Sequence, residues 1–332
     1  MGEFDLLAKL RARLPQPGPR VRLGSGDDAA ITVPGGATAT SVDALVDGVH
    51  FRREWSSLAQ IGRKALAAGL SDLAAMGAEP GEAYVVLGVP ADLDEDGCLE
   101  LFDGIAAQAA LSGAELVGGD VTRAPALTLA VTVVGHAPAA ERLVTRAGAR
   151  PGEVLALTGE LGGAAAGLLA LAHPDLAAAL PVATAERLRG RQLEPQPRLA
   201  AGSVLAEAGA TAMIDLSDGL GGDAGHLAAA SGVGLRIEAA ALPLDGGVAE
   251  IATAAGRDPL ELAASGGEDY ELLATLPHKR LAGAAAAVAK RGGTDLTRIG
   301  EVVAGEGVEI KLPDGRLLET ASFDQLSRTP SR

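Results

Sequence analysis

Aspartates recur in this sequence at positions where a carboxylate is costly to bury. Five of them follow or lie beside small or apolar residues: Asp28, Asp43, Asp72, Asp120 and Asp215. A carboxylate near a buried strand end loses solvation, so this many acids in one chain require cations to balance them. Carboxylate oxygens without a nearby cluster of His or Cys favour Mg²⁺, which binds through one or two carboxylates together with waters and phosphates. The pattern therefore predicts several magnesium ions on a polyphosphate.

Turn and cap chemistry offers a second interpretation of individual aspartates in the chain. Asp47 and Asp218 each precede a glycine, and Ser217 or Asp218 would suit the N-cap of a following helix. Asp27 and Asp28, in GSGDDAA, would each suit an Asx turn. The metal interpretation therefore depends on the acids acting together, not on any one of them.

Two further stretches partly match known ligand-binding loops. Residues 92–103, DLDEDGCLELFD, have EF-hand spacing but end in Asp103 instead of Glu and follow a strand, so an acidic helix start is favoured over calcium. Residues 158–167, TGELGGAAAG, read as a strand, a glycine loop and a helix start, but lack the Lys-Ser/Thr ending of a P-loop. Serine nucleophile elbows and protein-kinase motif sets do not occur.

The acids occupy particular places in a pattern of strands and helices that alternates twice. Strand-like segments are residues 37–46, 82–90, 114–119, 126–137, 153–159, 211–217 and 270–276. Helix-like segments are residues 61–78, 98–113 and 219–231. Asp120 and Asp215 fall at predicted strand ends, where open α/β sheets build sites, whereas Asp72 lies on the edge of an apolar helix face. Gly and Pro at residues 146–153 break the pattern, and we expect domains 1–140 and 141–332.

Length and charge limit the class of protein. The chain has 332 residues, enough for two domains, and a net charge of −15, which argues against nucleic acid or an anionic membrane as the partner. The start, MGEFDLLAKLRARL, predicts an amphipathic docking helix instead of a signal peptide, and we expect no transmembrane segment. The single cysteine, Cys98, excludes an intrachain disulfide and favours a reducing cytoplasm.

Seven motifs together resemble one known family. In order and approximate spacing they are GSGDDAA, SVDALVDGVHF, GLSDLAAMGAEP, LVGGDVTR, VTRAGARPGE, IDLSDGL and SGGEDYELL. They are similar to the thiamine-monophosphate kinase family, within the superfamily of aminoimidazole ribonucleotide synthetase. The resemblance covers nearly the whole chain and implies ATP-dependent transfer of the γ-phosphoryl group onto thiamine monophosphate, giving thiamine diphosphate and ADP. The attacking phosphate oxygen is already ionised, so this reaction needs metals and positioning but no general base.

The resemblance also implies roles for individual residues. The implied magnesium ligands are Asp28, Ser41, Asp43, Asp72, Asp120, Asp215 and Asp218, with Val42 at a position where many relatives carry Thr, so that only its backbone oxygen would serve. The implied ATP contacts are Gly119, Asp120, Arg146 and Ser217. The implied substrate contacts are His50, Glu268 and Phe323, and an acid near the cationic thiazolium ring is electrostatically reasonable.

The implied fold is a two-domain aminoimidazole ribonucleotide synthetase-like fold of mixed α/β and α+β class. An N-terminal mixed sheet with helices would bind ATP and Mg²⁺ and form a homodimer, and a C-terminal α+β domain would complete the nucleotide and substrate site. Two alternatives stay open. One is another ATP-dependent enzyme of the superfamily, and the other is a non-catalytic protein that binds thiamine phosphate or nucleotide.

Overall fold

The structure, a computed structural model, describes residues 2–25, 29–178 and 180–318. It divides into two compact units. Unit 1 comprises Met1–Val144 and Leu193–Glu207, and unit 2 comprises Thr145–Gln192 and Ala208–Arg332. The first division lies near the expected boundary at residue 140, but the sequence pattern did not indicate that Leu193–Glu207 joins unit 1. Within the described part of the chain, no helix has the length and hydropathy needed to cross a membrane.

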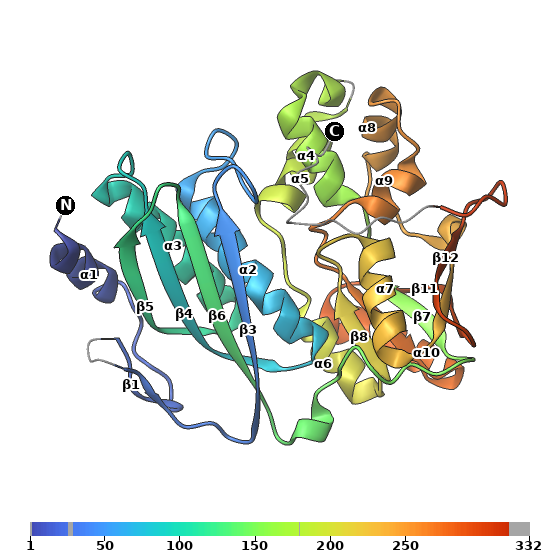
Figure 1. The fold of residues 1–332 in the computed structure, drawn as a ribbon, viewed down its shortest axis with the longest axis horizontal. Helices are drawn as coiled ribbons and strands as arrows, with labels where there is room; N and C mark the ends of the chain where they lie inside the picture. Colours follow the sequence, from blue (N-terminus) through green and yellow to red (C-terminus); the bar gives the residue numbers. More distant parts are fainter. Residues whose placement is uncertain (1, 26–28, 179, 319–332) are drawn as a thin grey trace. The chain divides into compact units, whose positions relative to one another are not determined.

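Unit 1 is built on a four-stranded mixed sheet in the order β3-β6-β4-β5 (Figure 1). Its strands are β3 (Ala37–Val46), β4 (Glu79–Val89), β5 (Glu115–Arg123) and β6 (Thr128–Ala137). β4 and β5 are parallel, and the other two pairings are antiparallel. A separate antiparallel pair, β1 (Val21–Leu23) and β2 (Ile31–Thr32), precedes the sheet. The predicted strand at residues 37–46 is confirmed residue for residue.

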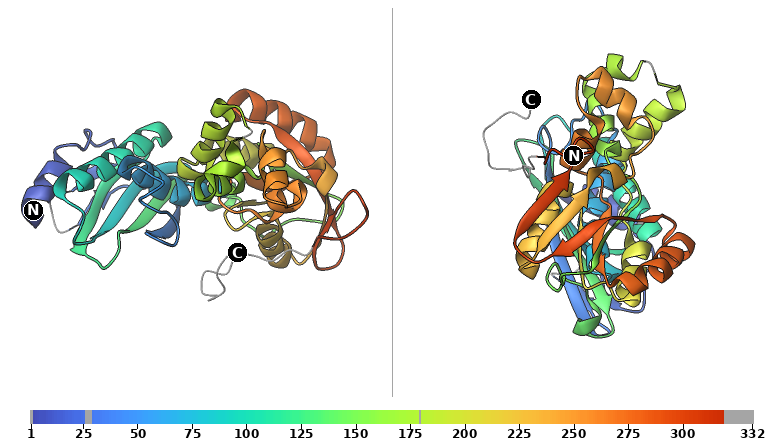
Figure 2. Two further views of the ribbon diagram at one scale, coloured as in Figure 1. Left: turned by 90° about the horizontal axis from the view of Figure 1, so that it is seen from above. Right: turned by 90° about the vertical axis from the view of Figure 1, so that its right-hand side faces the viewer.

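Two long helices cover one face of this sheet, as Figures 1 and 2 show. They are α2 (Leu58–Ala75) and α3 (Glu95–Ser112), and α1 (Glu3–Arg11) packs against α3. α2 starts with a capping box in which Ser57 and Gln60 exchange hydrogen bonds. Asp94 caps α3 by accepting from the Gly97 amide at 2.9 Å, and Gly113 ends it in a left-handed conformation. The acidic helix start predicted at residues 92–103 is thereby confirmed.

The opposite face of the sheet carries half-exposed small and β-branched side chains. Along β3, residues alternate between the two faces, and Val42 on this outer face is 65% exposed. Thr132 on β6, one of the two inner strands, pairs with Val42 on one side and Tyr84 on the other. Val86, on β4, is 41% exposed.

The return of the chain to unit 1 is explained by close packing between helices. α6 (Leu199–Ala208) lies against the end of α2, and a Cβ atom on Gly202 would lie 2.0 Å from the carbonyl oxygen of Ala74. Glycine at this position lets the two backbones approach each other, because any other residue would place its Cβ atom against the Ala74 carbonyl group. This long-range contact is why a boundary drawn from sequence alone misses Leu193–Glu207.

Unit 2 contains a six-stranded sheet in the order β12-β9-β11-β7-β10-β8, antiparallel except for the β12–β9 pair. Its strands are β7 (Val154–Thr158), β8 (Ala212–Asp215), β9 (Gly234–Glu238), β10 (Leu272–Leu276), β11 (Leu296–Val303) and β12 (Gly307–Lys311). α7 (Leu220–Ser231) packs on this sheet over a core that includes Leu155, Leu157, Ile214 and Leu227. α10 (Leu281–Ala287) contacts β11.

The remaining helices of unit 2 form a small cluster of their own, visible around α4 in Figure 1. They are α4 (Gly163–Ala172), α5 (Val182–Leu193), α8 (Val248–Ala254) and α9 (Pro259–Ser265). Short 3₁₀ turns at Ala140–Arg142, Pro174–Ala177, Ala239–Ala241 and His278–Arg280, and a π-helical turn at Val288–Gly292, complete the elements. Leu188, Val248, Ile251 and Leu262 form much of the core of this cluster.

Candidate functional site

Unit 1 brings three of the predicted magnesium ligands together. Ser41 and Asp43 lie two residues apart on β3 and point toward α2, where Asp72 lies. The Ser41 hydroxyl donates a hydrogen bond to Asp72 Oδ2. Gly69 lies on the same face of α2, three residues before Asp72, and a Cβ there would be 3.9 Å from Asp43 Oδ2. Sheet and helix therefore meet at a cluster of oxygen atoms.

Two carboxylates in this cluster oppose each other's ionisation. Burial, and after it the charge of Asp72, raises the pKa of Asp43 to about 6. A cation between the two would remove that penalty, and serine and carboxylate oxygens are suitable ligands for Mg²⁺. Val42 lies between Ser41 and Asp43 in sequence, but its side chain points to the other face of the sheet. A side-chain role for Val42 is thus excluded, and its backbone oxygen stays a prediction.

Asp120 occupies a different place from the one its sequence context indicated. β5 runs through Gly119 and Asp120 to Arg123, so Asp120 lies within the strand and the predicted strand end is wrong. Gly119 keeps the strand intact because a Cβ on it would be 2.0 Å from the Val85 carbonyl oxygen. Gly119 thus permits close approach to β4, and the strand continues past it.

Strand order separates Asp120 from the acid cluster. Asp43 pairs with Val131, Val131 with Val85, and Val85 with Gly119, so these residues form one row across the sheet. β3 and β5 are the two edge strands of the sheet. Three strand spacings put about 14 Å between them. Unit 1 therefore does not bring exposed Asp120 to Asp43 and Asp72, and its role as ligand stays a prediction.

The loop after β3 is held by charge and by a histidine. Arg53 donates hydrogen bonds to Asp47 at 2.8 Å and to Asp92 at 2.9 Å. The Asp47 carboxylate therefore forms an ion pair within the loop. His50 Nδ1 accepts from the Val46 amide at 3.0 Å. This bond requires an unprotonated Nδ1, which places the ring hydrogen of neutral His50 on Nε2. His50 can therefore donate a hydrogen bond to an anion.

Unit 2 gathers a second set of acids at the end of β8. Asp215 ends the strand and is 4% exposed, and Ser217 and Asp218 follow it. Burial raises the pKa of Asp218, an effect that the nearby positive charges of His226 and Arg146 partly offset. Arg146 is itself held in place because the Ser231 hydroxyl donates to its carbonyl oxygen at 2.9 Å.

Asp223 is a functional candidate that the motif analysis missed. Its Oδ2 accepts hydrogen bonds from the amides of Ser217 and Asp218, both at 3.0 Å. Burial, followed by the charge of Asp215, raises the pKa of Asp223 to about 7. Its place in the first turn of α7, five residues after Asp218, was the available sequence signal. Asp223 fixes the backbone of the segment that carries Ser217 and Asp218.

A strained loop brings Glu268 next to this segment. Glu268 and Tyr270 have φ angles of +66° and +51°, which residues with side chains rarely adopt. The Glu268 amide donates to the Ser217 carbonyl oxygen at 2.9 Å, and the Tyr270 amide to that of Leu216 at 2.9 Å. The structure thus sets the predicted substrate contact Glu268 beside the predicted ATP contact Ser217.

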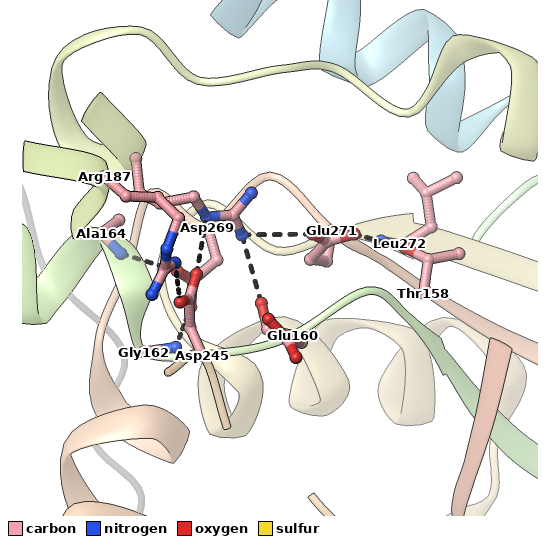
Figure 3. Close-up of polar contacts among 10 residues, drawn as sticks. Thr158, Glu160, Gly162, Ala164, Arg187, Asp245, Asp269, Glu271 and Leu272 are labelled. Atoms are coloured by element: carbon pink, nitrogen blue, oxygen red, sulfur yellow. Dashed lines mark hydrogen bonds and ion pairs between the residues drawn. The ribbon is translucent and has the colours of Figure 1, made fainter. Parts of the chain in front are cut away.

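Figure 3 shows the buried polar cluster under this loop. Asp269 accepts from the amides of Gly162 at 2.7 Å and Ala164 at 3.0 Å, so a carboxylate occupies the helix start that resembled a phosphate loop. Burial raises the pKa of Asp269 to about 6 against these two hydrogen bonds. Glu271, with no exposed surface, accepts from Thr158 at 2.8 Å and from Arg191 at 3.2 Å. The chain is therefore anchored directly after Glu268, at Asp269 and Glu271.

Two predicted residues, Asp28 and Phe323, lie outside the described residues. Within the described ranges, no group of three or more His, Cys, Asp or Glu side chains is arranged to hold a metal ion. The acids are found as pairs instead: Asp43 with Asp72, and Asp215 with Asp223.

Comparison with known proteins is consistent with this geometry. The model of the AIR synthase related protein N-terminal domain matches residues 26–137, and that of the C-terminal domain matches residues 150–313. The thiamine-monophosphate kinase of Mycobacterium tuberculosis is 41% identical over 282 residues, which cover 82% of this chain and 80% of that relative.

Solved structures agree with the sequence matches. The crystal structure of thiamine-monophosphate kinase from Stenotrophomonas maltophilia K279a aligns with a TM-score of 0.83 and 36% identity, over 96% of this chain and 98% of that one. A structure described as AaThiL complexed with AMPPCP and TMP aligns with a TM-score of 0.76 and 30% identity, over 96% and 94%. The predicted fold class is thereby confirmed, and the chain belongs to the thiamine-monophosphate kinase family of AIR synthase related proteins.

Proposed function

We propose that this chain transfers the γ-phosphoryl group of ATP to the phosphate of thiamine monophosphate, forming thiamine diphosphate and ADP. The observation that carries the proposal is the alignment, over nearly the whole chain, with the structure described as AaThiL complexed with AMPPCP and TMP. The described residues add acid pairs and an oriented histidine, which suit a reaction limited by bringing anions together.

Magnesium is the cation that these acid pairs would hold. Asp43 and Asp72 with the Ser41 hydroxyl form one oxygen set, and Asp215 with Asp223 a second, beside which Asp218 is a further proposed ligand. The raised pKa of Asp43 supports this assignment, because an ion there would relieve a charge repulsion that the fold otherwise maintains. Bound Mg²⁺ would supply the positive charge that a triphosphate needs beside carboxylates. Asp28, Asp120 and the Val42 carbonyl are further proposed ligands.

Contacts to ATP and to thiamine monophosphate are proposed for the residues that the family resemblance implies. Arg146 and Ser217, with Gly119 and Asp120, would bind ATP, and an arginine offers a fork of donors to phosphate. His50 would donate from Nε2 to the phosphate of thiamine monophosphate, and Glu268 would face the cationic ring. Phe323 is retained as a proposed aromatic contact.

We also propose a homodimer that forms through the outer face of the unit 1 sheet. Val42 and Val86 are well exposed there, and Thr132 is at its centre. Small and β-branched side chains on an uncovered sheet face suit packing against a second sheet. We place the enzyme in the cytoplasm, where a single buried thiol such as Cys98 stays reduced.

A coupled ADP-release assay tests the proposal. Purified protein with ATP and Mg²⁺ should release ADP with thiamine monophosphate but not with free thiamine or aminoimidazole ribonucleotide precursors. Mass spectrometry should identify thiamine diphosphate, and EDTA should abolish its formation. Turnover with another acceptor would favour a different enzyme of the superfamily, and tight binding of both ligands without product would favour a non-catalytic binding protein.

A further inference from the structure

A buried glutamine contacts the acid that we place at the substrate ring. Gln192, near the end of α5, donates from Nε2 to Glu268 Oε2 at 2.5 Å. Gln192 is 5% exposed, whereas Glu268 is half-buried and keeps part of its surface open to solvent. An ionised carboxylate can only accept, so the amide nitrogen must face Glu268.

This orientation of the Gln192 amide leaves its carbonyl oxygen, Oε1, in unfavourable surroundings. Gln192 Oε1 is buried, and no hydrogen-bond partner for it occurs among the described residues. A buried acceptor without a partner lowers stability, and an apolar side chain of similar size would avoid that cost. Glutamine here therefore reduces stability in return for one contact, the hydrogen bond to Glu268.

Helix packing keeps Gln192 from rotating away. α5 crosses α4 at Gly167, where a Cβ would lie 2.0 Å from the Leu188 carbonyl oxygen and 3.2 Å from Gln192 Cβ. The neighbouring Arg191 is directed elsewhere, to Glu271 and Asp245. The hydrogen bond thus starts from a rigid helix and ends on a side chain of the strained loop.

An amide is suited to orient a carboxylate that must stay negative. It donates a hydrogen bond without adding the positive charge that Lys or Arg would bring. A cationic heteroaromatic ring is attracted to the remaining charge, and holding the acid in place beforehand lowers the cost of binding.

We propose that Gln192 is a positioning residue that aims the Glu268 carboxylate at the cationic ring of the phosphate acceptor. This inference rests on the proposed function, because it assumes that Glu268 meets the substrate ring. It adds a residue on α5 to the determinants of acceptor specificity.

Steady-state kinetics of Gln192→Met test the inference. We expect the KM for thiamine monophosphate to rise about tenfold, while kcat and the KM for ATP stay within about twofold. Tm should stay equal or rise, since the orphaned acceptor is gone. Gln192→Asn keeps an amide but is one methylene too short to reach Glu268, and it should raise the same KM.

Two controls separate positioning from general damage. Gln108→Met makes the same change at a buried glutamine of unit 1 and should leave the KM for thiamine monophosphate unchanged. In a Glu268→Gln background, Gln192→Met should add no further effect, because the carboxylate that it aims is absent.

Three outcomes would overturn the inference. The first is an unchanged KM for thiamine monophosphate in an active Gln192→Met enzyme, and the second is a lowered Tm with both KM values raised together. The third is a full effect of Gln192→Met in the Glu268→Gln background. Wild-type protein that neither binds nor phosphorylates thiamine monophosphate would instead overturn the proposed function, and this inference with it.

Discussion

The Ser41 hydroxyl donates a hydrogen bond to the Asp72 carboxylate and so ties strand β3 to helix α2 at the acid cluster. Because Asp43 lies on the same face of β3 as Ser41, this bond fixes Asp72 beside a second carboxylate. A pair of acids held this way lowers the stability of the fold, because like charges at short range repel each other. The arrangement is better explained by a ligand of opposite charge.

Asp72→Asn should abolish phosphoryl transfer and leave the fold intact. The substitution keeps the size of the side chain and an oxygen that can accept from Ser41, but removes the charge that a metal ion would need. We expect kcat to fall by a factor of about 100 or more with no loss of Tm. Asp96→Asn, at an exposed acid in the first turn of α3, serves as the matched control and should retain activity. Full activity of Asp72→Asn would contradict the metal assignment.

Asp43→Asn should stabilise the metal-free protein at neutral pH. The pKa of Asp43 is raised from 3.8 to about 6 in the folded state. Between these values the folded protein keeps a proton that the unfolded chain has released, so raising the pH through this window lowers stability. Asparagine removes the dependence, and because Asp43 is only partly buried we expect a gain of about 1 kcal/mol. Urea denaturation in EDTA should show this gain at pH 7.5 and little of it at pH 4.5. A variant less stable than wild type at pH 7.5 would contradict the expectation.

Patterns within short stretches of sequence were enough to predict strand β3 and the position of Asp72 on its helix. The alternation of residues 37–46 gave β3, and the placement of Asp72 on the edge of an apolar helix face is what sets it against Asp43. The predicted strand end at Asp120 is wrong because β5 continues where Gly119 packs against the Val85 backbone, a contact that the local sequence does not mark.

Contacts between distant segments could not be predicted in the same way. Gln192 reaches Glu268 across 76 residues, and α6 joins unit 1 through the fit of Gly202 to Ala74. Neither pair has a sequence spacing that marks it. Asp223 is intermediate, because an acid in a first helical turn is ordinary, and its two hydrogen bonds to Ser217 and Asp218 depend on how the loop folds back.

Asp223→Leu and Asp223→Asn should differ sharply. Both amide hydrogen bonds end on one oxygen, Oδ2, so the single carbonyl oxygen of asparagine can accept both. Leucine leaves two partly buried amides unpaired, and we expect a loss of about 2 kcal/mol in the free energy of unfolding, together with a raised KM for ATP. Asp223→Asn should cost less than about 1 kcal/mol. Equal losses in the two variants, measured by urea denaturation, would show that these hydrogen bonds do not set stability.

Thr132→Lys should weaken the proposed homodimer. Thr132 is at the centre of the outer face of the unit 1 sheet, between Val42 and Tyr84, and a charge there would be buried between two sheets. Light scattering after size exclusion should show a shift toward monomer. Leu111→Lys, at a 70% exposed position on α3, is the matched control and should leave the oligomeric state unchanged. A dimer that persists in Thr132→Lys would place the interface elsewhere.

Two arginines beside the same acid should contribute unequally to stability. Arg191 is 17% exposed and bridges Asp245 and Glu271, whereas Arg187 is 45% exposed and pairs with Asp245. Removing one partner of a buried ion pair leaves a desolvated charge behind, whereas a surface pair is screened by water. Arg191→Met should therefore cost about 3 kcal/mol, and Arg187→Met about 1 kcal/mol or less. Because Arg191 also anchors the loop that carries Glu268, Arg191→Met should raise the KM for thiamine monophosphate as well. Equal shifts in Tm for the two variants would mean that burial does not decide the strength of these pairs.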